Sequence, residues 1–174
     1  MKHRNRVLLS AAIVLAVPCF AHGNAPAMAN SFDIENGDVH VHAKAAADAV
    51  ISPEGNLSVA GQAVTVTPTQ QALLKHYHTV VVALRDHAYE TGMAGAGIAA
   101  DALVLAATAI AGDDTAKSSR KVDATAEKIK AAATQICSDL ADIHITQDSI
   151  AQQLPVFRPY ATLDSDAVAN CHSN

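Results

Sequence analysis

The sequence predicts an α+β fold that is mostly α-helical: a small N-terminal antiparallel β-meander packed on the base of a long antiparallel two-helix hairpin. Apolar residues recur in alternating steps of three and four along 67–154, in two runs separated by Gly112. This spacing places the apolar side chains of each run in one stripe, as in a pair of packed helices. Upstream, 24–66 consists of short apolar runs divided by turn residues, which is typical of a meander.

The segment 1–23 has the composition of a secretory signal peptide. Three basic residues precede the apolar run Val7–Val17, which is too short to cross a bilayer as a helix. We expect cleavage after Ala21 or Gly23 and therefore export to the periplasm.

The exported chain is acidic. All seventeen Asp and Glu residues, but only nine of the twelve Lys and Arg residues, lie after residue 23, which leaves a formal charge of about −8. Nucleic-acid binding needs a basic face for the phosphates, so we expect no nucleic-acid partner. The same charge disfavours attraction to an anionic membrane surface.

Turn residues divide the region before the helices into short strands. Asn36-Gly37 predicts a turn before a strand over Asp38–His42, whereas Ala43–Ala49 fits either a helical turn or a link. Further short apolar runs are separated by turns at Pro53–Asn56 and at Ala60-Gly61. We expect these further runs, over 49–66, to form a meander of two or three strands, which is marginal alone and must pack on the helices.

Helix-starting and helix-ending residues bound each arm of the hairpin. Thr67 and Gln70 form a predicted capping box at the start of the first arm. Gly112 can end that arm in the left-handed conformation, and a residue within 113–115 then caps the second arm. Pro155 stops the second arm, because proline cannot continue a helix.

Each arm carries one apolar stripe. The first stripe comprises Leu74, Tyr77, Val81, Leu84, Ala88, Thr91, Gly95, Ile98, Ala102, Leu105 and Ala109. The second comprises Val122, Ala126, Ile129, Ala133, Ile136, Leu140, Ile143, Gln147, Ile150 and Leu154. The small residues around Gly92–Gly97 predict a closely packed tip with a kink. The larger side chains of Leu74–Leu84 and Ile143–Leu154 predict a thick base that carries most of the stability.

After Pro155 we expect an extended C-terminal tail over 155–174, because its first residues are rich in proline. The chain has few aromatic residues, and three of them are Tyr77, Phe157 and Tyr160. We expect these rings to meet near the base of the hairpin.

Two cysteines remain after removal of the signal peptide: Cys137 on the second arm and Cys171 near the C-terminus. An even number of cysteines in an oxidising compartment predicts a disulfide. This bridge would close a loop of about 34 residues and stabilise the fold by roughly 3–4 kcal/mol on the chain-entropy description. The spacing excludes a Cys-x-x-Cys redox pair.

His40 and His42 are the best metal-ligand candidates. Residues two apart on a strand point to the same face, so both imidazoles could reach one Zn²⁺ or Cu²⁺ ion. A third ligand would have to come from another element of the fold. The histidines of the predicted helices are His76, His78, His87 and His144. The alternative interpretation is a pair of half-exposed histidines on an edge strand.

The predicted helices carry weaker candidates. His76 and His78 diverge by about 200° around a helix and cannot chelate one ion together, so we interpret them as surface residues beside a core Tyr77. Asp139 and Asp142 could serve as an acid–base pair, although a solvated helix face explains them more simply. No nucleophile motif surrounds any serine. We therefore predict no catalytic residue, no metal ligand set and no cofactor.

The stretch 92–111 is rich in small apolar residues, which also occur where membrane helices pack together. Inserting it into a bilayer would bury Asp101, at roughly 2.5–3.5 kcal/mol. Close packing within the hairpin or between two copies fits this composition better than membrane insertion.

Residues 51–62 read Ile-Ser-Pro-Glu-Gly-Asn-Leu-Ser-Val-Ala-Gly-Gln and precede a predicted helix with Gln70 or Gln71 and Tyr77. This pattern resembles the YggN-like family of exported bacterial proteins, in which an Ile-x-Pro-Asp-Gly turn, a short strand and Asn-Gly-Lys lead into a helix with Gln and Tyr. The resemblance covers about 50–92 and departs where Ala-Gly-Gln stands in place of Asn-Gly-Lys. It implies a periplasmic or envelope location and a similar architecture, and no particular activity.

We expect an exported, non-catalytic structural or interaction protein whose hairpin contacts an unknown protein partner or a second copy. The first alternative is a metal-binding protein that uses His40 and His42. The second is membrane association through the helix at 92–111.

Overall fold

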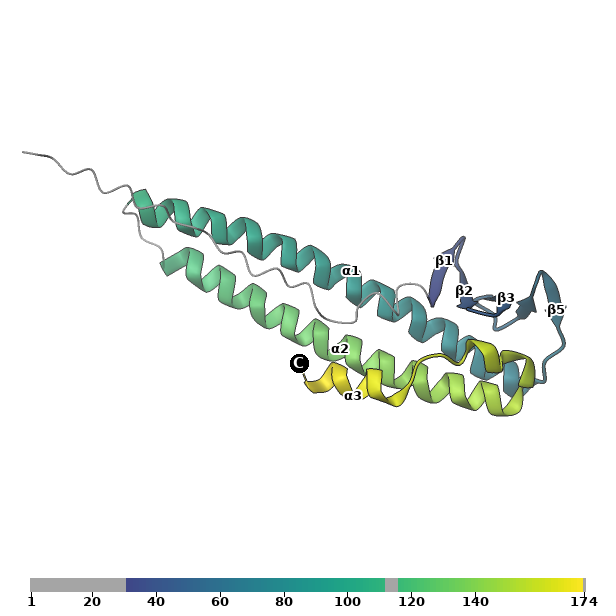
Figure 1. Cartoon of the computed structure of the whole chain (residues 1–174). Coiled ribbons are helices and arrows are strands. Elements are labelled where there is room, and N and C mark those ends of the chain that lie inside the picture. The colour runs from purple at the N-terminus through teal and green to yellow at the C-terminus, as the bar shows by residue number, and fades with distance from the viewer. Residues whose placement is uncertain (1–30, 112–115, 174) are drawn as a thin grey trace, which may run out of the picture.

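The computed structural model describes residues 31–111 and 116–173. It consists of a small antiparallel sheet followed by two long antiparallel helices, with the sheet at the base of the hairpin (Figure 1). The α+β, mostly helical fold class is therefore confirmed. The strands are β1 (Phe32–Glu35), β2 (Asp38–Ala43), β3 (Ala46–Ile51), β4 (Leu57–Val59) and β5 (Gln62–Val64). The helices are α1 (Pro68–Ala111), α2 (Ala116–Gln153), the 3₁₀ helix η2 (Pro155–Tyr160) and α3 (Ser165–Ser173).

The five strands follow one another across the sheet in chain order, each antiparallel to the next. The strand expected at Asp38–His42 is present as β2, and the meander expected over 49–66 is present as β3, β4 and β5, whereas β1 and the first half of β3 were not predicted. The turn at Asn36-Gly37 has positive φ at both residues (53° and 93°), and so does the turn at Ala60-Gly61 (52° and 74°). Two central residues with positive φ match the right-handed twist of a hairpin, so both predicted turns connect neighbouring strands.

One face of the sheet packs on the helices. Val39, Val41 and Ile51 are buried, and their strands contact α1 and η2. The residues between them, such as His40 and its cross-strand neighbour Val50, point to the opposite face. The sheet is therefore one layer of a two-layer structure, with the base of the hairpin as the other layer.

The predicted capping box is present at the start of α1. The backbone N–H of Thr67 donates to the Gln70 Oε1 at 2.9 Å, and the Gln70 N–H donates to Thr67 Oγ1 at 3.3 Å. The Gln70 Nε2 also donates to the carbonyl oxygen of Gln153 at 2.7 Å. One side chain therefore satisfies the first turn of α1 and the last turn of α2, and holds the two helix ends together. The predicted caps at 112–115 lie outside the described residues.

The main core lies where the base of the hairpin meets the sheet. Leu84 of α1 and Leu140 of α2 belong to the same buried cluster, as an antiparallel hairpin requires. The three aromatic residues meet there as expected. The ring centroids of Tyr77 and Phe157 are 5.8 Å apart at an interplanar angle of 80°, and those of Phe157 and Tyr160 are 5.6 Å apart. Edge-on contacts of this kind add to the stabilisation by buried area.

The predicted apolar stripes drift from the observed interface toward the tip. Ala88, Ala126 and Ala133 are exposed, whereas His87 and Ala132 are partly buried. An α-helix turns once in 3.6 residues, so a strict seven-residue repeat moves around a straight helix. Beyond Leu84 on α1 and before Cys137 on α2, none of the described side chains is buried. Among the side chains that the structure describes, the buried core is therefore confined to the base of the hairpin.

The expected extended tail over 155–174 is wrong. Pro155 begins the 3₁₀ helix η2, where its missing N–H costs no hydrogen bond. Phe157 and Tyr160 of η2 turn into the core. The chain then continues into α3, whose first turn is capped by Asp164, since its Oδ1 accepts the N–H of Ala167 at 2.8 Å. The tail thus folds back along α2 (Figure 1).

The turn between β3 and β4 fixes the sheet on α1. Gly55 has φ of +82°, and a Cβ atom there would lie 2.3 Å from the carbonyl oxygen of Gln71. The Gln71 Nε2 donates to the Glu54 carbonyl oxygen at 3.2 Å and to Asn56 Oδ1 at 3.3 Å. The absence of a side chain at Gly55 therefore lets the turn approach the helix backbone closely.

Gly55→Ala is expected to lower the free energy of unfolding by about 3 kcal/mol or more, because it adds a backbone clash to the strain of a positive φ. Gly61→Ala is the matched control: φ is +74° there, but a Cβ atom would meet nothing within 4 Å. This variant should lower the free energy of unfolding by only about 1 kcal/mol. Urea denaturation of both variants measures the difference, and equal losses would contradict the close docking of the turn.

Candidate functional site

The proposed metal ligands His40 and His42 lie on β2, on the face of the sheet that points away from the helices. Both ring nitrogens of His42 face carboxylates: Nδ1 lies 2.9 Å from Asp48 on β3 and Nε2 lies 3.3 Å from Asp33 on β1. A ring held between two carboxylates favours a proton on each nitrogen, and a protonated nitrogen cannot bind a metal. His42 is therefore an ion-pair partner in this structure.

Two histidines of the helices bind backbone carbonyl groups and do not join His40 and His42. His78 Nε2 donates to the carbonyl oxygen of Gly37 at 2.7 Å, and His144 Nδ1 donates to that of Leu163 at 2.9 Å. Neither lies with His40 and His42. Across the described residues 31–111 and 116–173, no group of three or more His, Cys, Asp or Glu side chains is arranged to hold a metal ion.

The carboxylates Asp33 and Asp48 raise the pKa of His42 above its usual 6.5. The hydrogen bond to Asp48 has the largest effect; burial lowers the pKa, and the bond to Asp33 raises it further. The folded chain therefore holds the His42 proton more tightly than the unfolded chain does. The ion pair joins β1, β2 and β3 across the solvated face of the sheet.

Two histidine–aspartate pairs connect the long helices. His76 Nε2 lies 3.0 Å from Asp142, and His87 Nδ1 lies 2.6 Å from Asp139. Asp139 is only 7 % exposed, so the interpretation of a solvated helix face is wrong for this residue. Within the described residues, no hydroxyl or thiol side chain hydrogen-bonds to either ring to act as a nucleophile. We interpret these pairs as contacts that align α1 with α2.

The interpretation of His76 and His78 is corrected in part. Tyr77 is buried, as expected, and the side chain of His76 is half-exposed. His78 is only 7 % exposed, because it bonds to the β1–β2 turn. The sequence did not reveal this contact, since it depends on where the sheet packs on α1.

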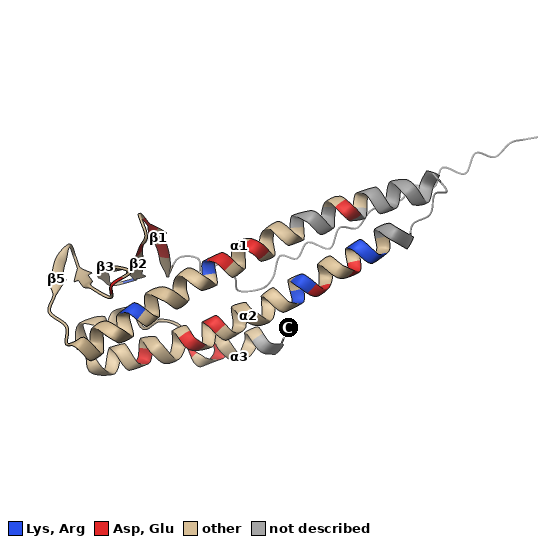
Figure 2. Ribbon diagram, turned by 180° about the vertical axis from the view of Figure 1, so that it is seen from behind, with Lys and Arg blue, Asp and Glu red and all other residues tan. Residues whose placement is uncertain are grey.

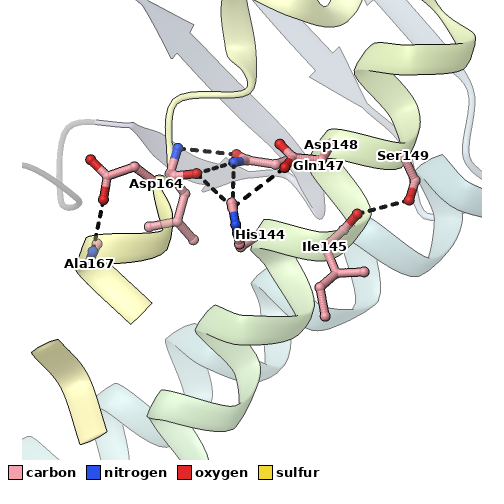
Figure 3. Close-up of polar contacts among 8 residues, drawn as sticks. His144, Ile145, Gln147, Asp148, Ser149, Asp164 and Ala167 are labelled. Atoms are coloured by element: carbon pink, nitrogen blue, oxygen red, sulfur yellow. Dashed lines mark hydrogen bonds and ion pairs between the residues drawn. The ribbon is translucent and has the colours of Figure 1, made fainter. Parts of the chain in front are cut away.

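Gln147 is the one polar residue of the second apolar stripe, and its hydrogen bonds explain why it lies in the core. It is 1 % exposed, its Nε2 donates to the carbonyl oxygen of Leu163, and its Oε1 accepts the Leu163 N–H at 3.2 Å. Figure 3 shows Gln147 and His144 of α2 directed toward the chain just before α3, while Ile145 points away. These hydrogen bonds hold the tail against the hairpin.

The predicted cysteine pair ties down the same segment. Cys137 of α2 and Cys171 of α3 are joined with a Cα–Cα distance of 5.5 Å across a sequence separation of 34. Gln147 and this disulfide therefore fix both ends of the last segment on α2. A disulfide of this kind persists in an oxidising compartment.

The distal half of α1 carries an exposed apolar face. The side chains of Tyr89, Met93 and Leu103 are 69 %, 58 % and 73 % exposed, and Ala100 between them is also exposed. At 100° per residue these four positions fall within an arc of about 80° on one side of the helix. We call these four residues the outer stripe.

Charges are distributed unevenly over the two arms. From 89 to 111, α1 contains only Glu90 and Asp101 as charged residues, and Asp101 pairs with Lys121 of α2 at 2.8 Å. Figure 2 shows both signs of charge on the distal part of α2. The outer stripe is thus an apolar surface without charged residues.

The stretch 92–111, the basis of the membrane alternative, belongs to α1. Among the described residues, no helix has both the length and the apolar character needed to cross a membrane. The expected signal peptide at 1–23 lies outside the described residues.

Comparisons of the chain with protein-family models, with characterised proteins and with solved structures give no match. The resemblance to the YggN-like family therefore stays a prediction.

The pH dependence of stability is expected to follow His42. Its raised pKa gives stabilisation that is complete below about pH 6.5 and is lost as pH rises through the folded-state value. Asp48→Asn should destabilise the chain more at about pH 5.5 than at about pH 8.5, because the protonated form of His42 that Asp48 stabilises becomes less populated as pH rises.

Histidine-ring NMR and urea denaturation at the two pH values check this prediction. Asp48→Asn should also lower the pKa of His42. Glu35→Gln removes a β1 carboxylate that does not contribute to the His42 shift, and it serves as the control. A His42 ring that titrates alike in wild type and Asp48→Asn would contradict the assignment.

Proposed function

We propose that this chain is an exported, non-catalytic interaction protein that associates with a second copy of itself through the distal half of its hairpin. The outer stripe of α1 carries the proposal: three large apolar side chains stand exposed on one face of a helix. Exposed apolar faces of this kind mark interaction sites in soluble proteins.

The thinness of the distal arm supports self-association. None of its described side chains is buried, and the three large apolar ones among them on α1 stand exposed. Packing the outer stripes of two hairpins against each other would place α1 of each copy between its own α2 and the α1 of the other copy. The apolar outer face of α1 would then be covered as well as the face that meets α2.

Charge also favours a second copy. The outer stripe contains no charged residue, and the nearby Asp101 is already paired with Lys121 of its own chain. Two identical stripes can therefore meet without burying like charges. By contrast, the net charge of the chain gives a strongly acidic partner no attraction.

The size of the outer stripe indicates how tightly two copies should associate. Fourteen residue steps from Tyr89 to Leu103 correspond to a length of about 21 Å on a helix. Together with a helix width of about 10 Å this is smaller than a standard interface of about 800 Å² on each partner. We therefore expect dissociation constants in the micromolar range or weaker.

The export part of the proposal is supported by the signal-peptide composition of 1–23 and by the Cys137–Cys171 disulfide. The Thr146 hydroxyl lies beside the His76–Asp142 pair, but it donates to Asp142 and not to the histidine ring, which favours a non-catalytic role. The metal-binding alternative loses support because both ring nitrogens of His42 face carboxylates.

Met93→Glu and Leu103→Glu are expected to keep the chain monomeric, because each places a carboxylate in the outer stripe. The wild-type chain should shift from monomer toward dimer between about 10 µM and about 1 mM in sedimentation equilibrium. Ile145→Glu is the matched control, since Ile145 is 64 % exposed but lies at the base. This variant should associate like wild type.

A wild-type chain that remains monomeric throughout that range would refute self-association. Equal association of wild type, Met93→Glu and Leu103→Glu would refute the outer stripe as the contact. Flotation of the monomer with liposomes, abolished by Leu103→Glu, would favour the membrane alternative instead.

A further inference from the structure

A cavity of about 110 Å³ lies at the base of the hairpin, between the sheet, the two long helices and the folded-back tail. Its walls are mostly apolar and come from every layer of the base. The apolar lining includes Phe32 of β1, Val41 of β2, Tyr77 of α1, Ile143 of α2, Leu163 and Ala167 of α3. The disulfide and Gln147 hold the tail that forms one side of the cavity, so its shape is fixed by the fold.

Tyr77 has a free hydroxyl at this cavity. The residue is 2 % exposed, and no hydrogen bond joins its hydroxyl to another described residue. Every fully enclosed side-chain nitrogen or oxygen in the described parts of the chain does have a partner. The Tyr77 hydroxyl is therefore not fully enclosed, and the open space beside it is the cavity that Tyr77 lines.

Two other polar groups of the lining are already used. The Tyr160 hydroxyl donates to the carbonyl oxygen of Ala47, and Gln147 exchanges two hydrogen bonds with Leu163. Ser31 and Thr162 also line the cavity, and both belong to the ends of the surrounding segments. A buried water uses two to four polar partners, and the mostly apolar walls offer few of them.

The chemistry of the walls limits the occupant. No charged side chain is buried in the lining, and Asp164 lies exposed at the rim. A charged group brought inside would lose its hydration without a partner. Burial also raises the pKa of Tyr77, so its hydroxyl stays protonated and can donate a hydrogen bond at any physiological pH.

We propose that this cavity binds one small neutral, mostly apolar molecule whose single oxygen accepts a hydrogen bond from the Tyr77 hydroxyl. An engineered apolar cavity of about 150 Å³ in another protein takes up benzene, so the space here suits a group of about one ring or a short branched chain. This site lies at the base and is independent of the outer stripe.

Acetophenone and ethylbenzene are matched probes, because they have similar size and shape and only acetophenone carries an oxygen acceptor. Titration of the oxidised chain, followed by methyl NMR, should move the signals of Val41, Ile143 and Leu163, which line the cavity. We expect acetophenone to bind with a dissociation constant of about 1 mM or below. The methyl groups of Ile145 and Leu103, which are exposed elsewhere, should not move.

Tyr77→Phe keeps the ring and removes the donor. It should weaken acetophenone binding by about five- to tenfold, as expected for one hydrogen bond, and leave ethylbenzene binding unchanged within about twofold. Tyr89→Phe, on the exposed distal arm, is the control variant and should change neither.

Failure of both probes to shift the Val41, Ile143 and Leu163 methyl groups at about 10 mM would overturn the proposal. So would equal acetophenone affinity in wild type and Tyr77→Phe, because the hydroxyl would then play no part. Uniform shifts over the cavity and the exposed methyl groups would indicate non-specific binding and would overturn it as well.

Discussion

The packing of α1 against α2 at the base of the hairpin is the interaction on which the rest of the structure depends. Leu74, Tyr77 and Val81 of α1 meet Ile143 and Ile150 of α2 in one buried cluster. The sheet is too small to be stable alone and takes its core from this cluster. The tail closes the remaining side through η2 and the disulfide. Loss of this contact would remove the support of every other element.

The sequence predicted those parts of the fold whose signals are local. These parts are the capping box of Thr67 and Gln70, the end of α2 before Pro155, and the turns at Asn36-Gly37 and Ala60-Gly61. Each depends on a few adjacent residues, and all are present. The first half of β3 was missed, because the alanines in 43–49 have no strand preference and the expectation there was a helical turn or a link. Cross-strand pairing with β2 makes this segment a strand. The helical tail was missed because proline disfavours α-helix but permits a 3₁₀ turn.

In the candidate sites, too, local signals could be predicted, and contacts between distant elements could not. The cysteine pair could be predicted from number and compartment, but the roles of His42, His78 and Asp139 depend on which elements pack together. The cavity beside Tyr77 carries no sequence signal, since its walls come from six separate segments of the chain. The outer stripe was also missed, because the repeat was assigned to the interface within the hairpin. The result is a base with a buried core and a cavity, and a distal arm whose α1 has an apolar outer face.

Amide hydrogen exchange at increasing protein concentration most directly tests the difference in stability between the base and the distal arm. In a dilute solution, amides of α1 beyond Leu84 and of α2 before Cys137 should exchange through local opening, whereas those near Tyr77 and Ile143 should require global unfolding. Raising the concentration should then slow exchange in the distal arm alone. Equal protection along both helices in dilute solution, with no dependence on concentration, would contradict a base that carries the stability and an arm that is completed by a second copy.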